Sequence, residues 1–185
     1  GGMLRVHANR SGFLLRDTSP SGHARNMHQP AGAPSARLSK ARYLAAAMSK
    51  ADFCYSPLGQ RAGDSDRYLP SILYGCIPVF IIEGEVGPLD EVIPWEDISV
   101  MLKATDLKDV HKILANISQE HIVHMRHAMA GVWERLLWTT SRPAFTKSGV
   151  DKRPFLGEDG GRDAFASLVD VLRLRLQRER HVMAK

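Results

Sequence analysis

ADFCYSPLGQRAGDSDRYLPSILYGCIPVFII, residues 51–82, contains the pattern from which the fold class follows. It contains two short apolar runs, at 53–57 and 77–82, that are typical of buried strands. Between them lie a polar loop with two glycines and an apolar segment at 70–74 that predicts a short helix. Pro78 lacks a backbone donor, so we expect it near the start of the second strand. The stretch therefore predicts a strand–helix–strand unit.

The same alternation of strands and helices continues along the chain. Ser39 is expected to cap an alanine-rich helix over 41–50, and a third strand is predicted at 98–102. Amphipathic patterns predict three further helices, at 105–116, 118–138 and 163–180. Strands separated by helices imply a parallel sheet with right-handed crossovers. The predicted fold class is therefore α/β, a doubly wound, Rossmann-like parallel sheet.

The composition is that of a globular chain with an excess of positive charge. Of the 185 residues, 44% are hydrophobic and 24% are charged, which excludes a wholly disordered protein and suits one domain or half of a two-domain enzyme. The net charge of +5 favours anionic partners such as phosphates or acidic glycans. The longest apolar run, 77–82, is shorter than the roughly 20 residues that cross a bilayer. Because Met3 follows two glycines, we expect a fragment of a longer protein.

Three parts are expected along the chain. Residues 1–140 are predicted to form the main domain, residues 141–161 a loop, and residues 162–185 a C-terminal helix. Within the main domain, residues 17–38 lack an apolar period and are rich in turn-forming residues. That composition is typical of a flexible surface insertion.

The loop at 59–66 is the candidate ligand site. In a parallel sheet, ligands bind beyond the carboxyl ends of the strands, and this loop follows one strand and opens the next helix. Its glycines would let backbone N–H groups approach an anion, while Arg61 and Arg67 supply positive charge. A diphosphate would fit such a site. The alternative is a solvated connection in which Ser65 or Asp66 only caps the helix.

Two other polar groups have simpler explanations than metal binding. Asp64-Ser65-Asp66 has the Asp-x-Asp spacing that can hold a divalent ion beside a diphosphate, but so short a motif often arises by chance. Helix capping explains it better, and no metal is expected. His121, His124 and His127 would spread across the polar side of a helix. A solvated helix face is favoured there over a zinc site.

The cysteines and most tryptophans are assigned to packing. Cys54 and Cys76 form no CxxC motif, and two separate buried thiols are favoured over a single disulfide. Trp133 and Trp138 are expected to pack against the domain rather than to form a platform for a sugar. For Trp95 two interpretations stay open, a residue that lines a pocket and a residue that packs beneath the next strand.

Several segments together resemble a known family. The run 51–59 (ADFCYSPLG), the loop ending in Ser65-Asp66-Arg67 and the run 74–81 (YGCIPVFI) resemble the exostosin-type glycosyltransferases. That family includes heparan sulfate polymerases and many plant and algal wall-polysaccharide transferases. Residues 87–95, 98–101 and, further upstream, 1–2 and 9–13 are similar to further segments of the family. The likeness covers roughly residues 1–140 and is weak across the insertion at 17–38.

The resemblance implies the C-terminal, nucleotide-sugar-binding half of a two-domain GT-B glycosyltransferase. This half would bind a UDP-sugar donor, without a cofactor, while the missing N-terminal half would bind the glycan acceptor and supply the general base. No catalytic residue is therefore assigned in this chain, no nucleic acid partner is expected, and the chain alone should be inactive. The donor-binding positions that match the family pattern are Gly59, Arg61, Gly63, Ser65 and Arg67, with Arg61 as a bidentate phosphate ligand.

Pro70 departs from the family pattern. The family usually carries an acidic residue at this position, suited to accepting hydrogen bonds from a ribose, and proline offers no such acceptor. Proline also disfavours helical angles at Leu69, so the helix is predicted to start at Pro70 itself. The alternative function is therefore a non-catalytic module of the same fold that binds an acidic glycan or nucleic acid.

Two glycosylation motifs agree with the compartment that the resemblance implies. Asn9-Arg10-Ser11 and Asn116-Ile117-Ser118 both fit the N-glycosylation rule, which makes Asn9 and Asn116 candidates for modification. Enzymes of the family act on the lumenal side of the Golgi membrane. The same location is expected here, with a membrane anchor that lies outside this chain.

Overall fold

The computed structural model describes most of the chain outside the N-terminal region and two long loops. The described residues are 11–12, 39–56, 67–81, 87–138, 144–146, 149–151 and 161–183. The predicted insertion at 17–38 and the loop at 59–66 lie outside them. In the region 141–161, which was predicted to be a loop, the structure contains a short antiparallel hairpin of strands β4 (Ala144–Thr146) and β5 (Gly149–Asp151).

A three-stranded parallel sheet forms the centre of the fold. Its strands are β1 (Phe53–Tyr55), β2 (Ile77–Ile81) and β3 (Val100–Leu102), in the spatial order β1-β2-β3. In the register, Phe53 pairs with Ile77 and Val79 pairs with Val100. Pro78 is the second residue of β2, as predicted. The strand–helix–strand unit read from residues 51–82 and its parallel pairing are therefore confirmed.

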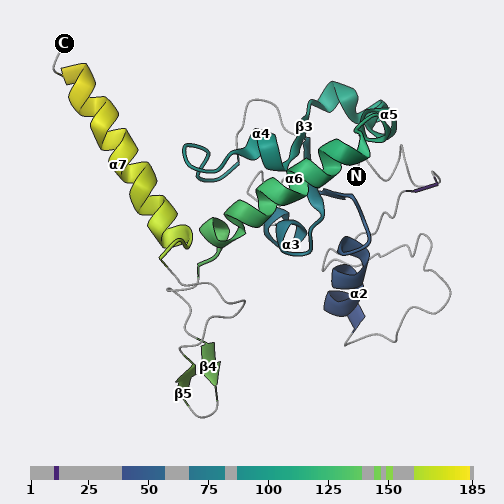
Figure 1. Cartoon of the computed structure of the whole chain (residues 1–185), viewed down its shortest axis with the longest axis horizontal. Coiled ribbons are helices and arrows are strands. Elements are labelled where there is room, and N and C mark those ends of the chain that lie inside the picture. Colours follow the sequence, from purple (N-terminus) through teal and green to yellow (C-terminus); the bar gives the residue numbers. More distant parts are fainter. Residues whose placement is uncertain are drawn as a thin grey trace.

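Helices cover both faces of this sheet (Figure 1). On one face Phe80 packs in a core with α3, α4 and α6, and on the other Val79 packs with Leu102 and Val110 beside α5. Because side chains alternate along β2, its neighbours Val79 and Phe80 enter opposite cores. The helical elements are α2 (Ser39–Met48), α3 (Tyr68–Leu73), α4 (Trp95–Ile98), the 3-10 helix η2 (Ala104–Lys108), α5 (Val110–Ala115), α6 (Gln119–Val132), the 3-10 helix η3 (Trp133–Leu136) and α7 (Ala164–Met183). The mixed α/β architecture is consistent with the predicted Rossmann-like class.

The prediction that the helix between the first two strands starts at Pro70 is wrong. Helix α3 begins at Tyr68, and Leu69 is helical. The first intrahelical bond runs from the Ser71 N–H to the Arg67 carbonyl, at 3.2 Å. Pro70 is the third helical residue, one of the positions whose N–H has no partner within a helix, so its missing N–H removes no bond.

The third strand and the long helix are shorter than predicted. Residues 98–99 do not belong to β3, because α4 ends there and the Ser99 hydroxyl donates to the Trp95 carbonyl at 2.6 Å. Helix α6 ends at Val132 rather than near 138, and the chain continues as η3, whose Leu136 is buried. No helix among the described residues combines the length and apolar character needed to cross a bilayer.

Trp95 belongs to the core. It is 2% exposed, and its ring makes edge-on contacts with Tyr68 at 5.3 Å and Phe80 at 5.6 Å between centroids. Its indole N–H donates to the Pro88 carbonyl at 3.0 Å. Packing is thus the correct one of the two interpretations left open for Trp95. Trp133 also packs against this core, as predicted. Trp138 was predicted to pack as well, but it is 48% exposed.

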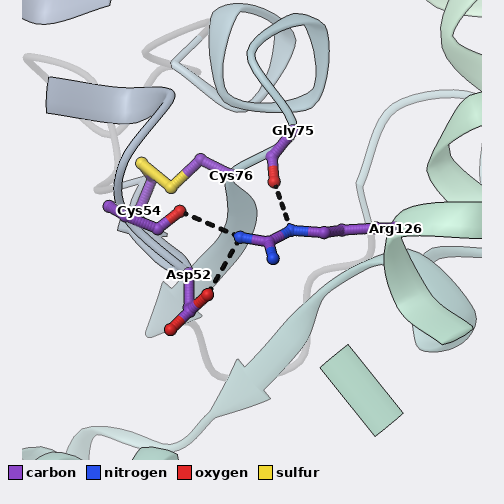
Figure 2. A network of polar contacts seen from close by, with 6 residues as sticks. Asp52, Cys54, Gly75, Cys76 and Arg126 are labelled. Carbon is purple, nitrogen blue, oxygen red and sulfur yellow. Dashed lines mark hydrogen bonds and ion pairs between the residues drawn. A yellow bond between two sulfur atoms is a disulfide. The ribbon is translucent and has the colours of Figure 1, made fainter. Parts of the chain in front are cut away.

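The expectation of two separate buried thiols is wrong, because Cys54 and Cys76 form a disulfide (Figure 2). Cys54 lies in β1 and Cys76 directly precedes β2, and the pairing of these strands brings the two Cα atoms to 5.7 Å. That distance is within the range that a disulfide spans. The sequence predicted both strands, but nothing in it established that they were neighbours at this register.

Arg126 of α6 fastens the segment that contains both cysteines (Figure 2). Its Nε donates to the Gly75 carbonyl at 2.8 Å, and one terminal nitrogen contacts both the Ala51 carbonyl at 3.3 Å and the Asp52 carboxylate at 2.9 Å. Gly75 has a φ of +71°, a conformation that glycine adopts without strain. These contacts lie at the amino ends of β1 and β2.

Candidate functional site

The carboxyl ends of all three strands lie at one edge of the sheet, because the strands are parallel. Tyr55, Ile81 and Leu102 are the last residues of β1, β2 and β3. Open parallel sheets bind ligands at this edge. The segments that leave it therefore contain the residues to examine for a site.

Arg67 is the predicted site residue that the structure describes. It immediately precedes α3, and its carbonyl accepts both the Ser71 N–H at 3.2 Å and the Ser71 hydroxyl at 2.7 Å. These two bonds fix its backbone at the start of the helix, while the residue itself is exposed. The side chain that this backbone carries ends in a guanidinium, a group that can bind an anion in two-pronged geometry.

Tyr55 shares this edge with Arg67 and was missed by the sequence analysis. Burial raises the pKa of the Tyr55 hydroxyl above its ordinary value of 10.0, and the positive charge of Arg67 acts in the opposite direction. The hydroxyl is therefore neutral at physiological pH and able both to donate and to accept a hydrogen bond. The sequence could have indicated Tyr55, because it is the last residue of a predicted strand and such positions lie at the edge where parallel sheets bind ligands.

Ser56 follows Tyr55 and is the second residue that the sequence analysis missed. It is 1% exposed, and its N–H extends the sheet by donating to the Val79 carbonyl at 2.9 Å. Among the described residues its hydroxyl has no hydrogen-bond partner. The Ser56 hydroxyl, next to Tyr55 in the chain, can therefore form a hydrogen bond with a ligand.

The other predicted site residues cannot be placed relative to Arg67. They lie outside the described residues and remain predictions: Gly59, Arg61, Gly63, Ser65 and the two aspartates of the Asp-x-Asp motif, Asp64 and Asp66. Pro70 is described and half-buried in the first turns of α3. It offers no acceptor there, so the departure from the family pattern persists in the structure.

The three histidines of α6 are exposed, as a solvated helix face requires. The rings of His121 and His124 stack with centroids 6.2 Å apart. Over the part of the chain that the structure describes, no three histidine, cysteine, aspartate or glutamate side chains gather in a way that could hold a metal ion. Metal binding therefore gains no support from α6.

The fold and this edge define a class of protein before any comparison is made. An α/β domain whose open parallel sheet carries an exposed arginine at the carboxyl edge is suited to a ligand with a phosphate group. The model of the Exostosin GT47 domain matches residues 9–117, which are 109 of the 185 residues. The chain belongs to this family, and the resemblance read from its motifs is confirmed.

Curated relatives carry glycosyltransferase names. The chain is 32% identical over 135 residues to the "Probable beta-1,4-xylosyltransferase IRX10L" of Arabidopsis thaliana, which covers 73% of this chain and 29% of that protein. It is 30% identical over 138 residues to the "Probable glucuronosyltransferase GUT1" of rice, Oryza sativa subsp. japonica, covering 75% and 29%. With the "Probable glucuronosyltransferase 47 A" of Physcomitrium patens it shares 35% identity over 97 residues, covering 52% and 21%. The chain thus spans less than a third of the length of these relatives.

Proposed function

We propose that this chain is the donor-binding half of a GT-B glycosyltransferase that transfers a sugar from a nucleotide sugar to a glycan acceptor. UDP is the proposed nucleotide, and residues 1–140 are the proposed donor-binding domain. The observation that carries the proposal is the exposed Arg67 at the carboxyl edge of the sheet, within the segment that matches the Exostosin GT47 domain. The names of the relatives support the same class of reaction.

In the proposed reaction, negative charge develops on the departing diphosphate. Arg67, together with Arg61 from the neighbouring loop, would stabilise that charge in the transition state. Gly59, Gly63 and Ser65 would contribute backbone and hydroxyl contacts. Helix α3 has only six residues, so the guanidinium groups rather than a helix dipole carry the argument. The acceptor site and the general base are assigned to the rest of the protein, and no metal or other cofactor is invoked.

The proposed location is the lumenal side of the Golgi membrane. The Cys54–Cys76 disulfide supports an oxidising compartment, because such bonds persist in secretory lumens and are rare in the cytosol. Asn116 supports it as well, since this glycosylation candidate is exposed between α5 and α6. The other candidate, Asn9, lies outside the described residues.

Calorimetric titration of the chain with UDP, GDP and ADP tests the donor site. The wild-type chain should bind UDP, and Arg67→Ala and Arg61→Ala should each weaken binding by roughly tenfold or more, since each removes a charge-assisted hydrogen bond. Arg173→Ala is the matched control, because this exposed arginine lies on α7. Equal weak heats for all four proteins with every nucleotide would contradict the proposal.

Pro70 motivates a second candidate, a non-catalytic module that binds an acidic glycan or nucleic acid. Its position in α3 removes the acceptor expected for a ribose. This candidate predicts retention on heparin that weakens steeply with salt, and no rise in melting temperature with UDP. A UDP-dependent rise in melting temperature would contradict this candidate and favour the first.

A further inference from the structure

Helix α7 carries an apolar stripe that the rest of the described structure leaves largely uncovered. The stripe follows a spacing of four and three residues in alternation; its apolar members are Phe165, Val169, Leu172, Leu176 and Met183, and Glu179 occupies the remaining position. Phe165, Leu172, Leu176 and Met183 are 55%, 56%, 49% and 86% exposed. This spacing keeps the side chains on one line along a length of about 27 Å.

The stripe is distinct from the face by which α7 packs on the domain. Ala164, Ser167 and Val171 are buried, and they lie roughly 120° around the helix from the stripe. Arg175 extends the buried face through an ion pair with Glu91 at 2.6 Å. Figure 1 shows the C-terminal part of α7 extending away from the sheet and its helices. Helix α7 therefore packs on the domain with one face and exposes the apolar stripe on another.

We propose that this stripe binds one amphipathic helix of a partner protein, with an apolar seam of the same spacing and carboxylates along its flank. The stripe alternates in steps of three and four, which is the pattern of helix-to-helix seams. Arg173 and Arg180 are exposed, one heptad apart, and border the stripe on the same side. Acidic residues at matching positions of the partner would face both arginines.

A second copy of the chain fits the stripe poorly. In a parallel pair Arg175 of one helix would face Arg180 of the other, and in an antiparallel pair Arg173 and Arg180 would face their own counterparts. Such like charges oppose association. A membrane surface fits poorly as well, because the apolar side chains form a narrow line that Arg173 and Arg180 border and Glu179 interrupts. Interfacial helices instead keep a wide apolar face.

The test measures binding between the full 185-residue chain and two synthetic peptides of about four heptads. Both peptides have leucine at the seam, and one carries glutamate and the other lysine along the flanks. Fluorescence anisotropy should show that the chain prefers the glutamate peptide by roughly tenfold at low salt, with the preference shrinking as salt screens the charges. Equal binding of both peptides, or binding of neither, would overturn the proposal.

Three variants separate the contributions to binding. Leu172→Ser with Leu176→Ser should weaken binding of the glutamate peptide by roughly tenfold or more, since two half-exposed leucines no longer enter the seam. Arg173→Glu with Arg180→Glu should invert the preference to the lysine peptide. Arg178→Glu, a single charge reversal on the opposite side of α7, should leave the preference unchanged. If the double charge variant still preferred the glutamate peptide, the proposal would be contradicted.

Two further measurements address the rejected occupants. Concentration-dependent dimerisation that Leu172→Ser with Leu176→Ser abolishes would overturn the proposal in favour of a second copy. Sedimentation of the chain with phosphatidylserine vesicles, lost in the same variant, would overturn it in favour of a membrane surface. A monomer that ignores the vesicles and prefers the glutamate peptide supports it.

Discussion

Gly87 lies against the ring of Trp95, and a Cβ built on this glycine would come within 3.0 Å of three indole atoms. Trp95 is itself fixed by Tyr68, by Phe80 and by its bond to the Pro88 carbonyl, so the ring has little room to move. Gly87→Ala should therefore destabilise the domain by about 1–3 kcal/mol, as overpacking of a core does. Urea unfolding followed by tryptophan fluorescence measures this loss.

Gly131→Ala is the matched control for this substitution. Gly131 lies in α6, is exposed, and would have nothing within 4 Å of an added Cβ. The same change should stabilise the chain by roughly 0.5–1 kcal/mol through helix propensity. Destabilisation by both variants to the same extent would show that the contact with Trp95 is not the cause.

Arg126 should matter more than its partial exposure implies. Arg126→Met would remove three contacts at once and leave the carbonyls of Ala51 and Gly75 without the donor they have now. A loss of about 1–3 kcal/mol in the free energy of unfolding is expected. Lys112→Met, which breaks the well-exposed pair with Asp109, should leave unfolding nearly unchanged. Equal urea midpoints for the two variants would contradict this ranking.

The disulfide ties β1 to the start of β2 and should stabilise the sheet. It joins residues 22 apart in the chain, and closing a loop of that length in the unfolded state corresponds to about 3 kcal/mol. The double variant Cys54→Ser, Cys76→Ser should lose this stability, measured by urea unfolding. Addition of a reductant should lower the urea midpoint of the wild-type chain and leave that of the variant unchanged. An equal change in both midpoints would contradict the disulfide.

The attachment of α7 should depend on pH through Glu91. The hydrogen bond from Arg175, with a backbone hydrogen bond second, lowers the pKa of Glu91 from its ordinary 4.5 to about 2. Because the folded pKa is the lower one, the stabilising contribution is present above pH 4.5 and is lost as the pH falls toward 2. The melting temperatures of the wild type and Glu91→Gln should therefore differ at pH 6 and converge near pH 2. A difference that does not vary with pH would refute the link.

The starts of α6 and α7 could be predicted from the sequence better than the end of α6. The two helices were predicted to begin at Ser118 and Asp163. The Ser118 hydroxyl accepts the His121 N–H at 3.2 Å, and the Asp163 carboxylate accepts the Ala166 N–H at 3.0 Å. Such caps depend on residues a few positions apart. The end of α6 instead depends on tertiary packing, because Leu136 of η3 is buried in the core. The hairpin at 144–151 was missed because each of its strands has only three residues, too few for an alternating pattern to stand out.

The edge of the sheet that holds the candidate site could be predicted, but its described members could not all be named. The alternation of strands and helices pointed to the segment that follows β1, and the family pattern made Arg67 a candidate. Tyr55 and Ser56 were missed because each looks like an ordinary strand residue until the sheet order and burial are known. The disulfide was missed for the same reason, since it depends on which strands are neighbours.

The share of the relatives that this chain covers leads to a prediction about activity. It spans 29% of the xylosyltransferase-named and rice relatives, and the described site contains groups for an anion but no candidate for a general base. If the proposed division of labour is correct, the 185 residues should bind UDP without transferring sugar from a UDP-sugar to oligosaccharide acceptors. The measurement is transfer of radiolabelled sugar by this chain and by the longer protein proposed above. Turnover by the chain alone would place the acceptor site and the base within these residues. A longer protein that binds UDP but transfers no sugar would instead favour a non-catalytic member of the family.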